Sequence, residues 1–169
     1  MSHSYIQAVL HTTFSTKYRR PLITPAVEVD LHHFLADRLQ HMRCKVYEIG
    51  GTLDHVHLLH GLPRQHSIAE VMQEVKSRSS CWMKSQGIRD FQWQVGYGCH
   101  SADYRRLESI RRYIRNQKLH HYGSLENYRR RAAITTFEQE YRCLLDRFDL
   151  AYREEYLFPT PPSPGADAA

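Results

Sequence analysis

Hydrophobic and polar positions alternate along some stretches of the chain and recur at every third or fourth position along others. Alternation that is rich in β-branched and aromatic residues predicts strands, and the longer spacing predicts amphipathic helices. The strand pattern covers residues 5–14, 45–49, 55–59 and 92–98. The helical pattern covers residues 24–42, 67–84 and 102–121, and a further amphipathic segment covers residues 135–158.

The predicted elements follow the order βαββαβ with an additional helix, which is typical of the ferredoxin-like split βαβ sandwich. The predicted fold class is α+β: one four-stranded antiparallel sheet, helices on one face, and an extra C-terminal helix that carries Tyr113. Gly50 and Gly51 are interpreted as the turn between the second and third strands. Residues 1–158 are expected to form a single domain, and the Pro-rich residues 159–169 are expected to be disordered because they offer nothing apolar to bury.

The composition is that of a globular protein, since 41% of the 169 residues are hydrophobic. No stretch reaches the roughly 18 apolar residues of a membrane span, and no signal-peptide pattern occurs, so we expect a soluble cytoplasmic protein without membrane contact. The four cysteines stand singly and are expected to be reduced, mostly buried thiols. Because the chain has 12 histidines, adjacent pairs such as His120-His121 are expected by chance.

Positive charge is concentrated between Ala102 and Arg131, where nine Arg or Lys residues accompany three acids. A basic block is most often a solvated helix face, but eight of the nine are arginines, whose forked guanidinium suits phosphate. The pattern is therefore also consistent with a nucleic-acid partner. The expected nucleic-acid-binding residues are Arg105, Arg106, Arg112, Arg115 and Lys118 of this block, together with Lys17 and Arg19 of an earlier basic loop.

Two motifs carry candidate chemistry. His55 and His57 lie two positions apart on a predicted strand, so their imidazoles point to one face and form half of a metal site. Tyr113 and Gln117 lie four positions apart on a predicted helix and share one face. Each motif alone is also consistent with ordinary packing or surface residues. Asp54, on the opposite face from His55 in a regular strand, is assigned a structural role in the turn.

Together these motifs resemble the HUH endonuclease superfamily, specifically the single-tyrosine transposases of small bacterial insertion sequences, with REP-associated tyrosine transposases as relatives. The resemblance covers nearly all of residues 3–158. The stretches that carry it are His11-Thr-Thr-Phe-Ser-Thr-Lys-Tyr-Arg19, Asp54-His-Val-His-Leu-Leu59, Tyr113-Ile-Arg-Asn-Gln117 followed by His120-His121, and Thr136-Phe-Glu-Gln-Glu-Tyr141.

The resemblance implies a DNA transposase that nicks and rejoins single-stranded DNA at element ends through a 5′-phosphotyrosine intermediate. It implies that Tyr113 is the nucleophile and that His55, His57 and Gln117 bind one divalent cation, Mg²⁺ or Mn²⁺; Asn116 and His120 are neighbours that could replace Gln117. It further implies DNA hairpins as partners and a homodimer in which the tyrosine helix can complete the site of the other subunit.

Three other interpretations fit parts of the sequence. A domesticated REP-associated relative, or a replication or conjugation nickase, would use the same chemistry in another process. A non-catalytic ferredoxin-like protein would bind RNA on the aromatic residues of an open sheet, although the third strand carries histidines where aromatics are expected. A plain zinc or hydrolytic site would leave Tyr113 without a role.

Overall fold

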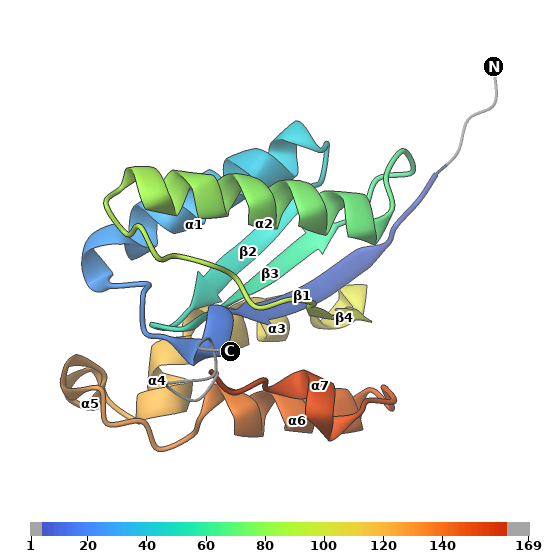
Figure 1. Ribbon diagram of the computed structural model, residues 1–169. Helices are drawn as coiled ribbons and strands as arrows, with labels where there is room; N and C mark the ends of the chain where they lie inside the picture. Colours follow the sequence, from blue (N-terminus) through green and yellow to red (C-terminus); the bar gives the residue numbers. More distant parts are fainter. Residues whose placement is uncertain (1–4, 162–169) are drawn as a thin grey trace.

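The computed structural model describes residues 5–161, and at its centre lies a four-stranded antiparallel sheet (Figure 1). The strand order is β2-β3-β1-β4, so β1 and β3 occupy the middle. This is the order of the split βαβ sandwich, and the predicted α+β class with one four-stranded antiparallel sheet is confirmed. The strands are β1 (Val9–Ser15), β2 (Val46–Gly51), β3 (His55–Gly61) and β4 (Gly98–Ser101).

Helices α1 (Pro25–His41) and α2 (Ile68–Ser85) cover one face of the sheet (Figure 1). Pro25 occupies the first turn of α1, and both hydrogen bonds of a capping box between Ser67 and Glu70 are present at the start of α2. Apolar residues at helical spacing meet the strands beneath them and form the main core. Its members include Phe14, Leu31, Leu35, Leu39, Val56, Leu58, Val71, Met72 and Val75.

The remaining helices lie on the opposite face of the sheet (Figure 1). The predicted helix over residues 102–121 is divided at Asn116, whose φ of −95° and ψ of 18° leave the helical region. Asn is a weak helix former because its amide competes for backbone hydrogen bonds. The elements on this side are the short helix η2 (Tyr104–Arg106), α3 (Leu107–Arg115), α4 (Gln117–Tyr122), α5 (Leu125–Arg130), α6 (Phe137–Arg147) and α7 (Glu154–Leu157).

Gly50 brings α3 into direct contact with the sheet. A Cβ atom at this position would lie 2.3 Å from the carbonyl oxygen of Ile114, so only glycine admits the helix at this distance. The prediction that Gly50 and Gly51 form the turn was wrong: both end β2, and the chain reverses at residues 52–54. The buried stripe of α3 includes Ile114, which packs against Val9 and Leu59 of the sheet.

The predicted strand over residues 92–98 was also wrong. Trp93 forms only an isolated bridge to Thr16, and β4 begins at Gly98. Trp93 is buried against Phe14, and its Nε1 donates a hydrogen bond to Ser79 Oγ at 2.9 Å, so side-chain packing in a loop produces the alternation. The first strand begins at Val9, the segment over residues 135–158 contains α6 and α7, and α5 was not predicted.

The four cysteines are free, as predicted, but Cys81 and Cys143 are exposed, so the prediction of mostly buried thiols was wrong for them. Within residues 5–161, no helix combines the length and the apolar character that crossing a membrane requires. Most of the tail predicted to be disordered, residues 162–169, lies outside the described residues.

Candidate active site

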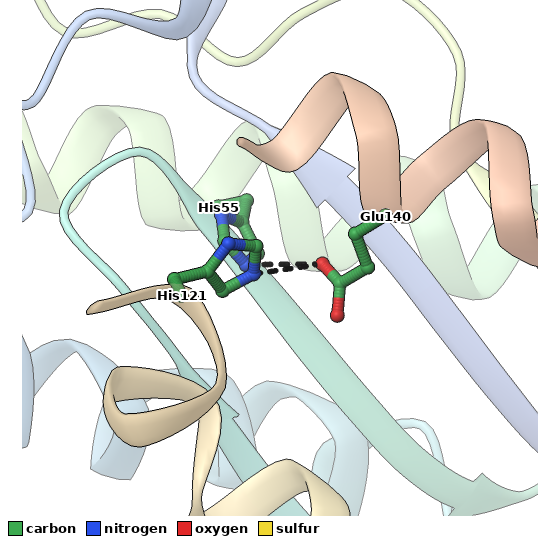
Figure 2. A group of neighbouring side chains, drawn as sticks. All are labelled: His55, His121 and Glu140. Carbon is green, nitrogen blue, oxygen red and sulfur yellow. Dashed lines mark hydrogen bonds and ion pairs between the residues drawn. The ribbon is translucent and has the colours of Figure 1, made fainter. Parts of the chain in front are cut away.

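Three histidine rings point toward one carboxylate, that of Glu140 on α6. His55 and His57 are wholly buried on one face of β3, as their spacing predicted. The Nε2 atoms of His55, His57 and His121 lie 3.5, 3.3 and 3.0 Å from Glu140 Oε2. Figure 2 shows His55 and His121 converging on this group from the strand and from α4. One strand and two helices therefore place three imidazole nitrogens around one oxygen.

Tyr113 and Gln117 reach the same carboxylate from α3 and α4. The Tyr113 hydroxyl donates a hydrogen bond to Glu140 Oε1, and Gln117 Nε2 donates to that oxygen at 3.1 Å. Gln117 Oε1 lies 3.3 Å from His55 Nε2. The four predicted residues, including His57, are thus brought together within one chain.

Asp54 orients His55 by contacting Nδ1, the ring nitrogen on the side away from Glu140. Its Oδ1 lies 2.7 Å from His55 Nδ1 and accepts a hydrogen bond from Thr52 Oγ1 at 3.0 Å. The assignment of Asp54 to the opposite face was therefore wrong, because the turn at residues 52–54 bends the chain before β3 begins. A proton on His55 Nδ1 leaves the Nε2 lone pair directed at Gln117 and Glu140. Burial lowers the pKa of His55, but the bond to Asp54 outweighs it and holds that pKa above its ordinary value.

His57 is held in a similar way by another imidazole. Its Nδ1 lies 2.9 Å from His11 Nε2 and 3.1 Å from Thr13 Oγ1. Burial lowers the pKa of His57, and the charge of Glu140 does not offset this effect. Burial, followed by the neighbouring rings, also holds the pKa of His11 well below its ordinary value. Both shifts in pKa favour the neutral form of these rings.

Glu140 and Tyr113 have opposite shifts in pKa. Burial raises the pKa of Glu140, but His57 and the other imidazoles outweigh burial and hold it far below its usual range. Burial, followed by the charge of Glu140, raises the pKa of Tyr113 well above its ordinary value. In this arrangement Glu140 is a carboxylate, and Tyr113 is a neutral phenol that donates to it.

The residues present fit a divalent cation. Ligand atoms of His55, His121 and Glu140 all lie within 4.8 Å of one another, and Gln117 adds an amide oxygen beside them. His57 Nε2 is buried and lacks a hydrogen-bond partner within the described part of the chain. Imidazole, amide and carboxylate donors together suit Mn²⁺, and the oxygen donors also suit Mg²⁺.

Two of these residues, Glu140 and His121, were not predicted. Glu140 lies within the stretch Thr136–Tyr141, which had been noted only for its resemblance. His121 belongs to an adjacent pair that was expected by chance and was otherwise noted only for the same resemblance. Of the proposed substitutes for Gln117, Asn116 is exposed at the helix break, and His120 Nε2 lies 3.7 Å from Glu140 Oε1. Their positions depend on the break at Asn116, which the sequence pattern did not indicate.

Comparison with known proteins gives the family. Residues 4–117 match the model of the family described as "Transposase IS200 like", and this match covers more than half of the chain. The chain belongs to this family of transposases. The matched part contains His55, His57, Tyr113 and Gln117, whereas Glu140 lies beyond it. No curated protein matches the sequence significantly.

Two solved structures resemble the transposase in fold. One, from Deinococcus radiodurans R1 and provisionally described as a transposase, is 24% identical; it covers 69% of this chain and 96% of its own, with a TM-score of 0.55. The other is a REP-associated tyrosine transposase bound to a REP hairpin. It is 15% identical and covers 71% of this chain and 70% of its own, with a TM-score of 0.51.

A cleft of about 510 Å³ opens beside the tyrosine of the transposase. Tyr113 and Glu140 lie in its wall, together with Arg106 and Arg147. His100 and Phe148 line another part, where their rings stack with centroids 3.6 Å apart. The cleft therefore places cationic and aromatic groups near the Tyr113 hydroxyl.

The basic residues expected to bind nucleic acid fall into two groups. Arg105, Arg106 and Arg112 are exposed, and no acid within residues 5–161 lies within ion-pair distance of them. The other four have partners in the fold. Arg115 pairs with Glu48 at 2.8 Å, Lys118 with Glu28 at 2.6 Å and Arg19 with Glu138 at 2.6 Å, and Lys17 donates to Gln92 at 2.9 Å. Nucleic-acid binding by all seven stays a prediction.

Proposed function

We propose that this transposase breaks and rejoins single-stranded DNA, with Tyr113 as the nucleophile. The observation that carries the proposal is the shared carboxylate, since Glu140 contacts both the Tyr113 hydroxyl and the imidazoles of β3. His55, His57 and Gln117 would hold a divalent cation, with Glu140 and His121 as additional donors. In this arrangement the hydroxyl of Tyr113 lies next to the centre that would receive the scissile phosphate, which supports its proposed role.

The reaction follows from the positions of these groups. The cation, when bound, would polarise the scissile phosphate and offset the negative charge of Glu140. The Tyr113 oxygen attacks phosphorus while its proton leaves along the hydrogen bond to Glu140 Oε1. The bond from phosphorus to the 3′ oxygen breaks, and that oxygen takes up a proton from water and leaves as a 3′ hydroxyl, while Glu140 releases the proton of Tyr113 to water. The phosphotyrosine keeps the ester, so another 3′ hydroxyl can reverse the reaction and join a different strand.

The proposed substrate is single-stranded DNA with hairpins at the ends of the element. A REP-associated transposase of similar fold is bound to a hairpin, which supports this choice. Arg106 lines the cleft, and Arg105 and Arg112 are exposed. All three precede the helix break at Asn116 and offer cations for phosphates. Recognition of RNA on an open sheet is not supported, because α3 packs directly on the face opposite α1 and α2.

A covalent-capture assay tests the proposal. Labelled single-stranded DNA from the flanks of the gene is incubated with the protein and Mn²⁺ or Mg²⁺, and a denaturing gel is examined for a protein–DNA band. The band should disappear with EDTA and in Tyr113→Phe. The exposed Tyr104 provides the matched control, so Tyr104→Phe should keep the band. A band that persists in Tyr113→Phe would overturn the assignment of the nucleophile.

A further inference from the structure

His11 is a buried histidine that the proposed reaction does not use, and it lies between His57 and the cleft. Its Nε2 is 2.9 Å from His57 Nδ1, and its Nδ1 is 3.1 Å from His100 Nε2. Only 3% of His11 is exposed, and both His11 and His100 line the cleft, whereas His57 does not. The three rings therefore form one chain of hydrogen bonds from the interior to the cleft wall.

The hydrogen bonds along the three rings can run in two directions, from His57 toward His100 or the reverse, because each neutral imidazole carries one ring proton. In the first, His57 Nδ1 donates to His11 and His11 Nδ1 donates to His100, which leaves a lone pair on His57 Nε2. In the second, His11 donates to His57, whose proton then lies on Nε2, 3.3 Å from Glu140. Only the first direction allows His57 to bind a cation. Thr13 Oγ1 selects neither, since a hydroxyl both donates and accepts.

We propose that His11 is a positioning residue, which accepts the His57 Nδ1 proton in a hydrogen bond and keeps the Nε2 lone pair directed at the cation site. Histidines that bind metals usually have their second nitrogen bonded to a carboxylate or a carbonyl group, as Asp54 provides for His55. At His57 an imidazole takes that place. The inference rests on the proposed function only in placing a cation at His57.

The test measures Mn²⁺ binding without DNA, by the EPR signal of the free ion. His11→Leu removes the acceptor and should weaken binding about 10- to 100-fold. His11→Gln carries an oxygen that can accept the same hydrogen bond, and it should recover most of the loss. His60 is the matched control, because it is equally buried on β3 but bonds to Thr12 on the other face. His60→Leu should bind Mn²⁺ like the wild type.

Each outcome decides the proposal. Binding in His11→Leu that equals the wild type, or that is no weaker than in His60→Leu, overturns it. If His11→Leu does not fold, NMR of the wild type with Mg²⁺ decides instead: long-range ¹H–¹⁵N correlations should place the His57 proton on Nδ1, and a proton on Nε2 overturns the proposal.

The covalent-capture assay separates this inference from the proposed function. If the wild type does not capture DNA but Mn²⁺ binding is weakened in His11→Leu, the proposed function is rejected and the role of His11 is kept. Normal capture with unchanged Mn²⁺ binding in His11→Leu rejects only the role of His11. A wild-type protein that binds no Mn²⁺ overturns both.

Discussion

Glu140 is the residue that joins the two halves of the candidate site. It receives hydrogen bonds from Tyr113 and Gln117 on one oxygen and faces three imidazoles with the other. Among the residues that the structure describes, Glu140 also supplies the only negative charge that points toward the Nε2 atoms of the imidazoles, since the carboxylate of Asp54 is bonded to Nδ1 of His55. The hard cation Mg²⁺ depends on anionic oxygen more than Mn²⁺, which accepts imidazole readily.

We therefore expect Glu140→Gln to weaken Mg²⁺ binding more than Mn²⁺ binding. The amide keeps the shape of the side chain but removes the charge, so the ratio of the two dissociation constants should rise. Isothermal titration with each metal measures this ratio. Glu138→Gln on the same helix is the control, since Glu138 pairs with Arg19 outside the centre. Equal losses for the two metals in Glu140→Gln would contradict the assignment of its carboxylate as a metal donor.

His60 determines part of the dependence of stability on pH. Burial lowers its pKa from 6.5 to about 4, so the unfolded chain takes up this proton first as the pH falls. Stability is therefore lost below about pH 6.5, and between pH 7 and pH 4.5 the loss is about 2 to 3 kcal/mol. In His60→Gln, the free energies of unfolding measured with urea at the two pH values should differ by less than in the wild type. The remaining difference comes from His32, whose pKa burial also lowers to about 4. Equal differences in both proteins would contradict this account.

At the scale of elements, α6 is the helix whose placement matters to the candidate site. Thr136 and Gln139 form a capping box at its start, and Ser67 and Glu70 form the same motif at the start of α2. Replacing either cap by alanine should cost about 1 kcal/mol. Because α6 carries Glu140 and α2 carries no residue of the site, the two losses should differ in their consequences.

Thr136→Ala should weaken Mn²⁺ binding by up to about fivefold, the equivalent of that cost, whereas Ser67→Ala should lower only the free energy of unfolding. Metal titration and urea unfolding of both variants measure the two effects. The interpretation of α6 would fail if Ser67→Ala weakened Mn²⁺ binding as much as Thr136→Ala.

The sequence predicted the elements that have a strong period and missed those that depend on contacts between distant segments. The helical stripes of α1 and α2 and the alternation of β3 are local patterns, and all three are present. Trp93 alternates with its neighbours because it packs against Phe14, which lies far away in the sequence. Gly50 is required by the approach of Ile114, and this requirement has no local signal that differs from that of a turn.

The candidate site shows the same division. His55 and His57 share a face because of the strand period, and Tyr113 and Gln117 reach one carboxylate from positions four apart. Glu140 could not be assigned in this way, because its role depends on how α6 packs after a change of direction in the chain. Only its position in a stretch already noted for its resemblance provided a signal.

At the scale of the whole molecule, the two faces of the sheet carry different kinds of residue. The face toward α1 and α2 holds the main apolar core, whereas the opposite face holds His11, His55, His57 and Glu140. This second face is completed by α3, α4 and α6 of the same chain. Ile114 holds α3 against Gly50, and the Tyr113 hydroxyl and the histidines of β3 meet at Glu140.

Exchange of the tyrosine helix between subunits would have to break all of these contacts together. We therefore expect the site to act within one chain, whether or not the transposase forms the predicted homodimer. Co-expressed Tyr113→Phe and His57→Ala subunits should not recover covalent DNA capture, since one lacks the proposed nucleophile and the other an imidazole of the centre. Each variant co-expressed with the wild type is the control and should retain capture. Recovery in the mixed variants would show that α3 leaves Gly50 and completes the site of a second subunit.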